Sequence, residues 1–319
     1  MKIFAPLFIA GREPVLDGLR ALAILLVLFT HIFQQIPGLS FVWGKVEWLS
    51  PLYNGWVGVD LFFVLSGFLI GGQVFRAFED KSFSFYHFYA RRSLRIFPAY
   101  FTILALVCFF WFIFPSLHPY FNFNENLSLD TILKNYLFVT NYFPTQQMGV
   151  GSWSLSNEEQ FYLFLPIFFM LLNSYQKKTK IQVLMMVILL ALVIRMITYR
   201  LYDIGPGYPW FEFMGHIYTP FHTRMDSLAA GVCAYMIYAS DFKENLKQVS
   251  SFLIFIGLIF TGFVFLTGTL TGGWFNTTLQ FTLLAIGFAS IILGTINDTK
   301  SYLSRLFSAR IWIPIARLS

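Results

Sequence analysis

Long apolar runs recur along this sequence, and they limit the folds open to it more than any other feature. They occupy 15–34, 55–75, 96–115, 156–174, 181–201, 221–239, 251–268 and 275–296. An α-helix needs about 20 mostly apolar residues to cross the hydrocarbon core of a bilayer. The pattern therefore predicts an all-α fold, a polytopic transmembrane helical bundle with about eight spans.

The composition argues against a soluble protein. Hydrophobic residues make up 57% of the chain and charged residues only 12%, whereas soluble domains carry about 25% charged residues. The net charge of +6 fits basic cytoplasmic loops, so we expect no nucleic-acid partner. Cys108 and Cys233 lie inside apolar runs without metal-ligand spacing, so we expect buried thiols and no metal site.

The distribution of Lys and Arg predicts the orientation in the membrane, because cytoplasmic loops carry an excess of both. One set of alternate loops carries most of them: Lys2, Arg12, Arg76, Lys81, Arg91, Arg92, Arg95, Lys177, Lys178, Lys180, Lys243, Lys247, Lys300, Arg305 and Arg310. We therefore expect a cytoplasmic N-terminus. The apolar segment 2–10 is too short for a span and has no convincing cleavage site. The stretch 127–143 is interrupted by charges, so we expect an interfacial or re-entrant element.

Ionisable groups inside the first two spans are candidate functional residues, because a charge in a membrane is costly. Arg20 and His31 are eleven positions apart, so they share one helix face and are separated by roughly 16 Å along the axis. Asp60 in the second span is expected at a similar depth to His31, where it could orient the imidazole. A snorkelling arginine and hydrogen bonds inside the bundle explain the same residues without catalysis.

Two further groups of charges flank the third and fourth spans. Arg92 and Arg95 are one helical turn apart and could fork around a phosphate, although basic loops usually serve only as topological anchors. Glu158 lies at the start of the fourth span, where an acidic group also suits the helix dipole. Trp153 precedes it at the expected interface. Glu158 is therefore a candidate acid or base that also has a structural explanation.

Another pair of charges opens the sixth span. Arg224 and Asp226 could form a simple ion pair at the outer interface or contribute to an acceptor site. The spacing of the two residues does not decide between these interpretations.

Five stretches together resemble the membrane-bound acyltransferase-3 family, which includes bacterial O-acetylases of glycans. They are LDGLRALAILLVLFTH at 16–31, GVDLFFVLSGFLI at 58–70, YARRSLRIFPAY at 89–100, WSLSNEEQFYLFLP at 153–166 and TRMDSLAAG at 223–231. Each is weak alone, but all five occur in the order typical of the family. The resemblance implies a multi-pass protein of the bacterial inner membrane.

The resemblance also implies roles for individual residues. Arg20 and His31 match a motif of a basic residue, ten spacers and a histidine, and Arg92 and Arg95 match a paired-arginine motif associated with the acyl donor. Glu158 matches the acidic residue after a tryptophan-serine-leucine motif. The implied donor is acetyl-CoA or another acyl-CoA. The implied acceptor is a sugar hydroxyl of a cell-surface glycan or lipid-linked sugar.

These observations combine into one functional hypothesis. Arg20, Arg92 and Arg95 hold the coenzyme A phosphates on the cytoplasmic side. The thioester then reaches the outer half of the membrane, where His31 acts as general base on an acceptor hydroxyl. The predicted site residues around it are as follows: Asp60 and Glu158 orient His31 or bind the acceptor, and Trp153, Arg224 and Asp226 belong to the acceptor site.

Residues 1–319 are expected to form a single integral membrane acyltransferase domain. The family usually continues past a segment such as IPIARLS at 313–319 with about two further helices, so a truncated core is expected. Two other functions remain open from the residues alone: a transporter or flippase for an amphipathic solute, and a non-catalytic scaffold. No inverted repeat is visible in the sequence, which argues against the transporter.

Overall fold

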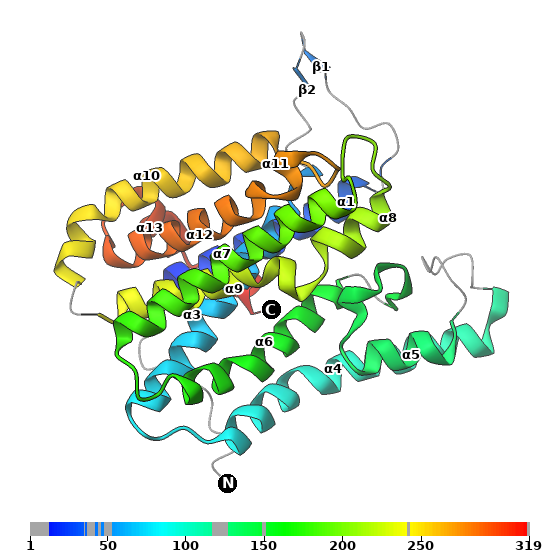
Figure 1. The fold of residues 1–319 in the computed structure, drawn as a ribbon, viewed down its shortest axis with the longest axis horizontal. Coiled ribbons are helices and arrows are strands. Elements are labelled where there is room, and N and C mark those ends of the chain that lie inside the picture. The colour runs from blue at the N-terminus through cyan, green and yellow to red at the C-terminus, as the bar shows by residue number, and fades with distance from the viewer. Residues whose placement is uncertain are drawn as a thin grey trace.

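The computed structural model describes residues 13–34, 36, 42–43, 46–47, 53–116, 127–148, 151–240 and 243–317. Each of the eight predicted spans is a helix in it. They are α1 (Pro14–Gln34), α3 (Val57–Glu79), α4 (Phe85–Ile113), α6 (Ser152–Leu171), α7 (Lys177–Leu201), α9 (Phe221–Tyr238), α10 (Lys243–Thr267) and α12 (Leu279–Asn297). The predicted all-α helical bundle is therefore confirmed (Figure 1).

Short elements connect the long helices. They are α5 (Leu129–Tyr136), η2 (Thr140–Tyr142), η3 (Pro144–Gln146), α8 (Trp210–Phe213), the π-helix η4 (Met214–Tyr218), α11 (Trp274–Thr277), α13 (Tyr302–Phe307) and α14 (Trp312–Ala316). Two strands, β1 (Val42–Trp43) and β2 (Val46–Glu47), form an antiparallel hairpin in which Val42 pairs with Glu47. The segment 2–10, with Lys2 and Arg12, lies outside the described residues.

Six helices within the described residues are long and apolar enough to cross a membrane: α1, α3, α4, α7, α10 and α12. The helices α6 and α9 fall outside this group although both were predicted as spans. Each opens on polar residues, SWSLSNEEQ in α6 and FHTRMDS in α9, which lower the hydropathy of the whole helix. The six apolar helices agree with a multi-pass membrane protein.

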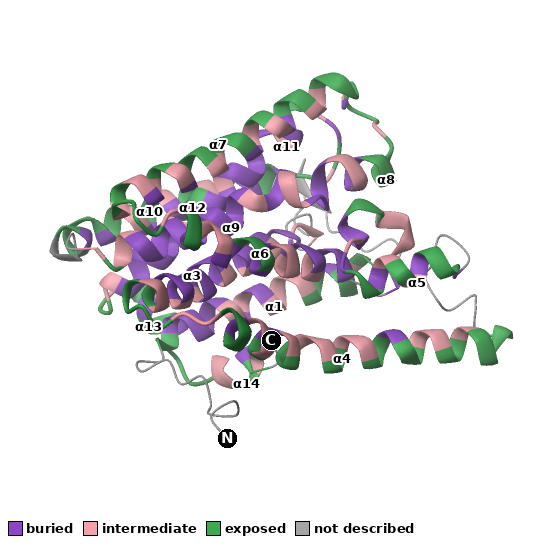
Figure 2. Cartoon of the chain, turned by 60° about the horizontal axis from the view of Figure 1, so that its bottom comes forward, coloured by how far each residue is buried: buried purple, intermediate pink, exposed green. Residues whose placement is uncertain are grey.

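The long helices differ in how many of their side chains are buried. In α9, nearly every residue from Thr223 to Met236 is buried, and α3 and α12 are buried over most of their length. In α4, by contrast, only Phe88, Arg92 and Leu104 are buried among the described residues (Figure 2). Many apolar side chains of α4, α7 and α10 are exposed. This suits helices that face lipid, because the hydrocarbon core of a bilayer is itself apolar.

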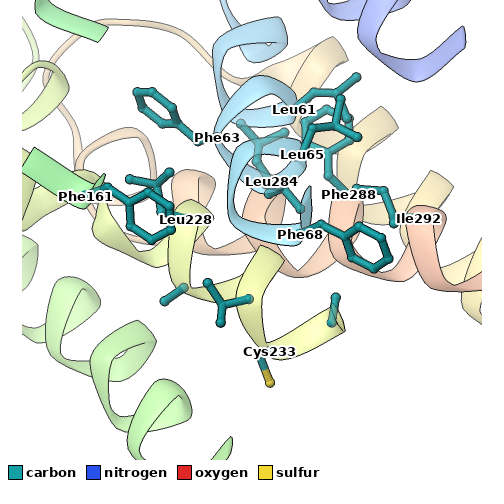
Figure 3. Close-up of a cluster of buried hydrophobic side chains, with 14 of the residues drawn as sticks. Leu61, Phe63, Leu65, Phe68, Phe161, Leu228, Cys233, Leu284, Phe288 and Ile292 are labelled. Atoms are coloured by element: carbon teal, nitrogen blue, oxygen red, sulfur yellow. The ribbon is translucent and has the colours of Figure 1, made fainter. Parts of the chain in front are cut away.

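The core lies where α3, α9 and α12 meet. Leu61, Leu65 and Phe68 of α3 lie in one apolar cluster with Leu228 of α9 and Phe288 of α12 (Figure 3). Because α3 is central, its polar residues are held in a rigid frame. The polar residues of α3 face two directions: some face α1, α4 and α6, and others face α9 on the opposite side.

Glycines allow α3 to approach its neighbours closely. A Cβ atom at Gly67 would collide with the backbone oxygen of Leu228, and one at Gly58 would lie 2.7 Å from the backbone oxygen of Ala23. Close helix approach is the usual use of small residues in membrane bundles. Gly58 and Gly67 are therefore packing positions between α3 and its neighbours.

The stretch 127–143 contains no spanning helix. It forms the eight-residue α5 and the 3₁₀ helix η2, and α5 exposes Leu129, Leu133 and, just after it, Leu137. Lys134 pairs with Asp130 and also donates a hydrogen bond to Gln146. A short amphipathic helix with its charges paired is consistent with the predicted interfacial element.

Candidate functional site

A cavity of about 270 Å³ lies between α1, α3, α4 and α6. Aliphatic and aromatic side chains make up part of its lining, but its polar groups come from all four helices. These are Arg20 of α1, Ser66 of α3, Arg92 and Arg95 of α4, and Glu158 and Tyr162 of α6. The three arginines predicted to bind the donor therefore line one cavity, although they are up to 75 positions apart in the sequence.

The cavity lies well inside the bundle. Arg20 is six residues from the first residue of α1 and Arg92 is seven from the first residue of α4, or roughly 10 Å along each axis. Ser66 and Glu158 lie thirteen residues before the ends of α3 and α6, or roughly 20 Å. All four distances are measured from the ends predicted to be cytoplasmic. The carboxylate of Glu158 and the hydroxyl of Ser66 therefore lie well inside α6 and α3.

Glu158 is the acidic group of this cavity, and both of its oxygens have donors. The hydroxyl of Ser66 donates to Oε1 at 2.8 Å, and the hydroxyl of Tyr162 donates to Oε2 at 2.9 Å. The first bond joins α6 to α3, and the second lies one turn further along α6. These two bonds fix the carboxylate in a single orientation, with Ser66 directly beside it.

The arginines of the cavity are held in different ways. Arg92 is buried, donates to Oε1 of Gln73 at 3.2 Å and lies over the ring of Tyr162 at 5.6 Å. Arg20 pairs with Asp17 at 3.5 Å on its own helix. Arg95 is exposed but still contributes to the lining. Three guanidinium groups against one carboxylate leave this cavity with a net positive charge, which favours an anionic occupant.

The structure places His31 elsewhere. The ring is exposed at the far end of α1, and Nδ1 lies 2.7 Å from the carbonyl oxygen of Val27. Since a carbonyl oxygen can only accept a hydrogen bond, Nδ1 is the donor in this contact. His31 does not line the cavity that contains Glu158.

Asp60 is not at the depth of His31. A Cβ at Gly55 would meet Leu26 and Thr30, and one at Gly58 would meet Ala23 and Leu26, so α1 and α3 run antiparallel in this register. Asp60 is then roughly 10 Å deeper than His31 along the bundle. Its carboxylate accepts hydrogen bonds from Arg224 at 2.8 Å and from Ser227 at 2.9 Å. The predicted orientation of His31 by Asp60 is not what the structure shows, because Asp60 is bonded to α9 instead.

The predicted ion pair between Arg224 and Asp226 is also replaced by pairs between helices. Arg224 binds Asp60 of α3, and Asp226 accepts from Arg195 of α7 at 2.7 Å. All four side chains are fully buried, and the guanidinium of Arg224 lies 4.1 Å from the ring centre of Phe281. Two residues along an α-helix correspond to a rotation of about 200°. The side chains of Arg224 and Asp226 therefore point in nearly opposite directions and reach different partners. These pairs join α3, α9 and α7.

Trp153 is a core residue in the structure. Its ring is buried and lies edge-on to Phe63 and 4.7 Å from the ring centre of Tyr218. It therefore positions the start of α6, while the predicted contact with a substrate stays a prediction. Among the residues that the structure describes, no group of three or more His, Cys, Asp or Glu could hold a metal ion.

Arg195, Ser66 and Tyr162 are among the residues of these networks to which sequence analysis assigned no role. Arg195 had a clear signal, since it is an arginine in the middle of the apolar run 181–201 and follows the rule used for Arg20. Tyr162 had a weak signal, because it lies four residues after Glu158 and so on the same helix face. Ser66 had none, because neutral hydroxyl groups are common in membrane helices, and only the pairing of α3 with α6 shows that it donates to Glu158.

Comparison with known proteins identifies relatives along most of the chain. The peptidoglycan O-acetyltransferase OatA of Listeria monocytogenes is 30% identical over 92% of this chain and 46% of its own length. The O-acetyltransferase OatA of Staphylococcus aureus is 29% identical over 60% of this chain and 30% of its own length. An uncharacterised protein of Haemophilus influenzae is 35% identical over 44% of this chain and 59% of its own length.

The chain spans about half the length, or less, of the OatA relatives that it matches. No solved structure matches it. The family described as "Acyltransferase domain" matches residues 13–319, which include all the motifs named above and every residue that lines the cavity. The resemblance seen in the five sequence motifs is therefore confirmed, and the chain belongs to the acyltransferase-3 family.

Proposed function

We propose that this protein is a membrane O-acyltransferase that moves an acyl group, in the first instance acetyl, from acyl-CoA to a hydroxyl group of an extracytoplasmic glycan or glycolipid. The observation that supports this most is the cavity with Arg20, Arg92, Arg95 and Glu158 in its lining. It combines a positive potential, suited to a polyphosphate donor, with a carboxylate that can accept a proton. The named relatives are O-acetyltransferases, one of them of peptidoglycan.

Donor binding is assigned to the arginines. Arg92 and Arg95 are one turn apart near the predicted cytoplasmic end of α4, so their forked guanidinium groups can bind phosphate oxygens of coenzyme A. The pantetheine arm then extends into the cavity. This direction brings the thioester towards Ser66, which lies seven residues, or roughly 10 Å, further along α3 than Gln73, the hydrogen-bond partner of Arg92.

Proton transfer is assigned to Glu158. It lines the donor cavity, whereas His31 is roughly 20 Å away from the level of Ser66 along the bundle axis. A general base must come within hydrogen-bond reach of the hydroxyl from which it takes a proton. We assign to His31, exposed at the predicted outer end of α1, the binding of the acceptor as it enters. The sequence prediction that His31 is itself the base stays a prediction.

The orientation follows the positive-inside rule: a cytoplasmic N-terminus in a bacterial inner membrane, with donor inside and acceptor outside. A transporter of an amphipathic solute would use the same buried charges, but it would not cleave a thioester. The two functions therefore differ in whether free coenzyme A is produced.

The test uses the full chain, purified and reconstituted in lipid nanodiscs, with acetyl-CoA labelled in the acetyl group. Free coenzyme A and labelled glycan are measured with and without a soluble peptidoglycan fragment as acceptor. We expect the acceptor to increase coenzyme A release and to become labelled. Movement of the glycan across a vesicle membrane without any coenzyme A release would overturn the proposal in favour of transport.

A further inference from the structure

Ser66 is the one cavity hydroxyl that reaches the carboxylate from another helix. Several hydroxyl groups inside the long helices donate to a backbone oxygen one turn earlier, as Thr198, Ser250, Thr261 and Thr295 do. This local bond is the ordinary way to satisfy a hydroxyl in a membrane. Ser66 instead donates to Oε1 of Glu158 at 2.8 Å, from the middle of α3.

The arrangement around Ser66 is that of an activated nucleophile. A serine hydroxyl is a weak nucleophile until an adjacent base removes its proton, and nucleophile and base must lie within hydrogen-bond distance. The base must in turn be oriented by a third group. Tyr162 supplies this by donating to the other oxygen of Glu158 at 2.9 Å. Ser66 is therefore in the position of a nucleophile, Glu158 in that of its base, and Tyr162 in that of the group that orients the base.

The arginines favour reaction at this position. Arg20, Arg92 and Arg95 line the same cavity, so their positive potential acts on the negative charge that develops on the carbonyl oxygen of a thioester under attack. The cavity is also bounded by apolar side chains such as Phe62, Leu65 and Leu69, which limit access of water to an ester formed there. Both conditions are what a covalent acyl intermediate requires.

We propose that Ser66 is acylated by the donor, so that transfer proceeds through an acyl-Ser66 intermediate; this rests on the function proposed above. In the first step Oγ of Ser66 bonds to the acyl carbon, the carbon–sulfur bond breaks, and the hydroxyl proton passes through Glu158 to the leaving coenzyme A thiolate. In the second step an acceptor hydroxyl attacks the ester carbon. Its proton passes through Glu158 to Oγ of Ser66, which leaves and restores the starting state.

With an acyl-Ser66 intermediate, the two substrates occupy the cavity one after the other, whereas direct transfer requires both at once. Coenzyme A leaves towards the predicted cytoplasmic side before the acceptor hydroxyl arrives, so a single cavity of about 270 Å³ need not hold both substrates. Transfer then has two half-reactions. The first one is complete without any acceptor, and this allows the inference to be tested apart from the glycan.

The experiment measures that first half-reaction with the full chain in nanodiscs. Labelled free coenzyme A is mixed with unlabelled acetyl-CoA and no acceptor, and label appearing in acetyl-CoA is followed. In parallel, protein incubated with acetyl-labelled acetyl-CoA is quenched in acid, digested and examined for an acetylated peptide that contains Ser66. We expect exchange of label and up to one acetyl group per chain, located on Ser66.

Three variants complete the design. Ser66→Ala should lose both exchange and acetylation, and Ser66→Cys should keep the label in a thioester that hydroxylamine cleaves. Ser290→Ala is the matched control, because Ser290 is a half-buried serine in the middle of α12 that does not line the cavity. Size-exclusion profiles show whether each variant is folded.

The outcomes separate the inference from the function on which it rests. Acceptor-dependent transfer by the wild-type chain without exchange, or full exchange by Ser66→Ala, overturns acyl-Ser66 and leaves the acyltransferase intact. A wild-type chain with neither exchange nor transfer overturns both proposals. Exchange that is lost in Ser66→Ala, retained in Ser290→Ala and accompanied by acetyl on Ser66 supports the intermediate.

Discussion

Glu158 and His31 are both able to accept a proton, but their surroundings differ. Glu158 is oriented by Ser66 and Tyr162 inside a cavity with three arginines, whereas His31 is exposed and bonded only to its own helix among the contacts described. Chemistry at the single-residue scale therefore depends on location. A base is useful only where donor and acceptor meet, and the cavity that we propose for the donor contains Glu158.

Replacing each residue with glutamine tests this assignment. Glutamine keeps the size and hydrogen bonds of the side chain but does not act as a base. Because general-base assistance is worth about 10²–10⁴ in rate, Glu158→Gln should lower acetyl transfer by about that factor. His31→Gln should weaken acceptor binding, seen as a raised KM for the glycan, and should leave coenzyme A exchange unchanged. The opposite pattern, with exchange lost in His31→Gln and kept in Glu158→Gln, would identify His31 as the base.

The arginine pair on α4 has its own test. If Arg92 and Arg95 bind the coenzyme A phosphates, replacing both with Ala should weaken binding of coenzyme A at least tenfold in equilibrium dialysis, since each charge-assisted bond contributes about 1.5–3 kcal/mol. Replacing both with Lys should recover part of the affinity, because Lys keeps the charge but lacks the fork. Unchanged binding by the double Ala variant would mean that the two residues serve only as topological anchors.

The packing of α3 against α9 determines where Ser66 lies. Leu228 and Gly231 of α9 lie against Gly67 of α3, and the buried pairs of Asp60 with Arg224 and of Asp226 with Arg195 extend the contact to α7. Ser66 is the residue before Gly67. A shift of α3 against α9 would therefore move the hydroxyl relative to Glu158, which α6 carries.

Gly67→Ala measures how much this packing contributes to stability. The added Cβ collides with the backbone oxygen of Leu228, and overpacking of this kind costs about 1–3 kcal/mol. We expect a lower Tm in detergent. Gly262→Ala in α10 is the matched control, because nothing lies within 4 Å of its added Cβ. Its Tm should be unchanged or higher, since Ala favours a helix over Gly by about 0.5–1 kcal/mol. Equal Tm values for both variants would show that the α3–α9 contact is not tight.

Helices could be predicted from the sequence more reliably than the contacts between them. The eight apolar runs each became a helix because hydropathy is a property of one segment at a time. The partners of Asp60, Arg224 and Asp226 depend on the rotation and register of three helices against one another. Nothing in a single sequence fixes that register. The three arginines were found because each stands out locally, whereas Ser66 becomes visible only once α3 and α6 are side by side.

At the scale of the whole molecule, the orientation in the membrane determines which substrate reaches the cavity from which side. Lys178 lies at the start of α7, and Pro206 lies in the loop at its other end; both are exposed. In a chain with Cys108 and Cys233 replaced by Ala, a cysteine at 178 should react with a membrane-impermeant maleimide only after the cells are opened. A cysteine at 206 should react in intact cells. Labelling of position 178 in intact cells would reverse the orientation and place the donor arginines on the wrong side.

The central claim, acyl transfer to an extracytoplasmic glycan by the cavity that contains Glu158, is tested most directly by the O-acetyl content of cell-surface glycans. Three otherwise identical bacterial strains are compared: one without the protein, one with the wild-type chain and one with Glu158→Gln at equal membrane levels. The account predicts O-acetylated glycan with the wild-type chain and a return to the level of the empty strain with Glu158→Gln. Equal O-acetylation in the wild-type and Glu158→Gln strains would contradict it.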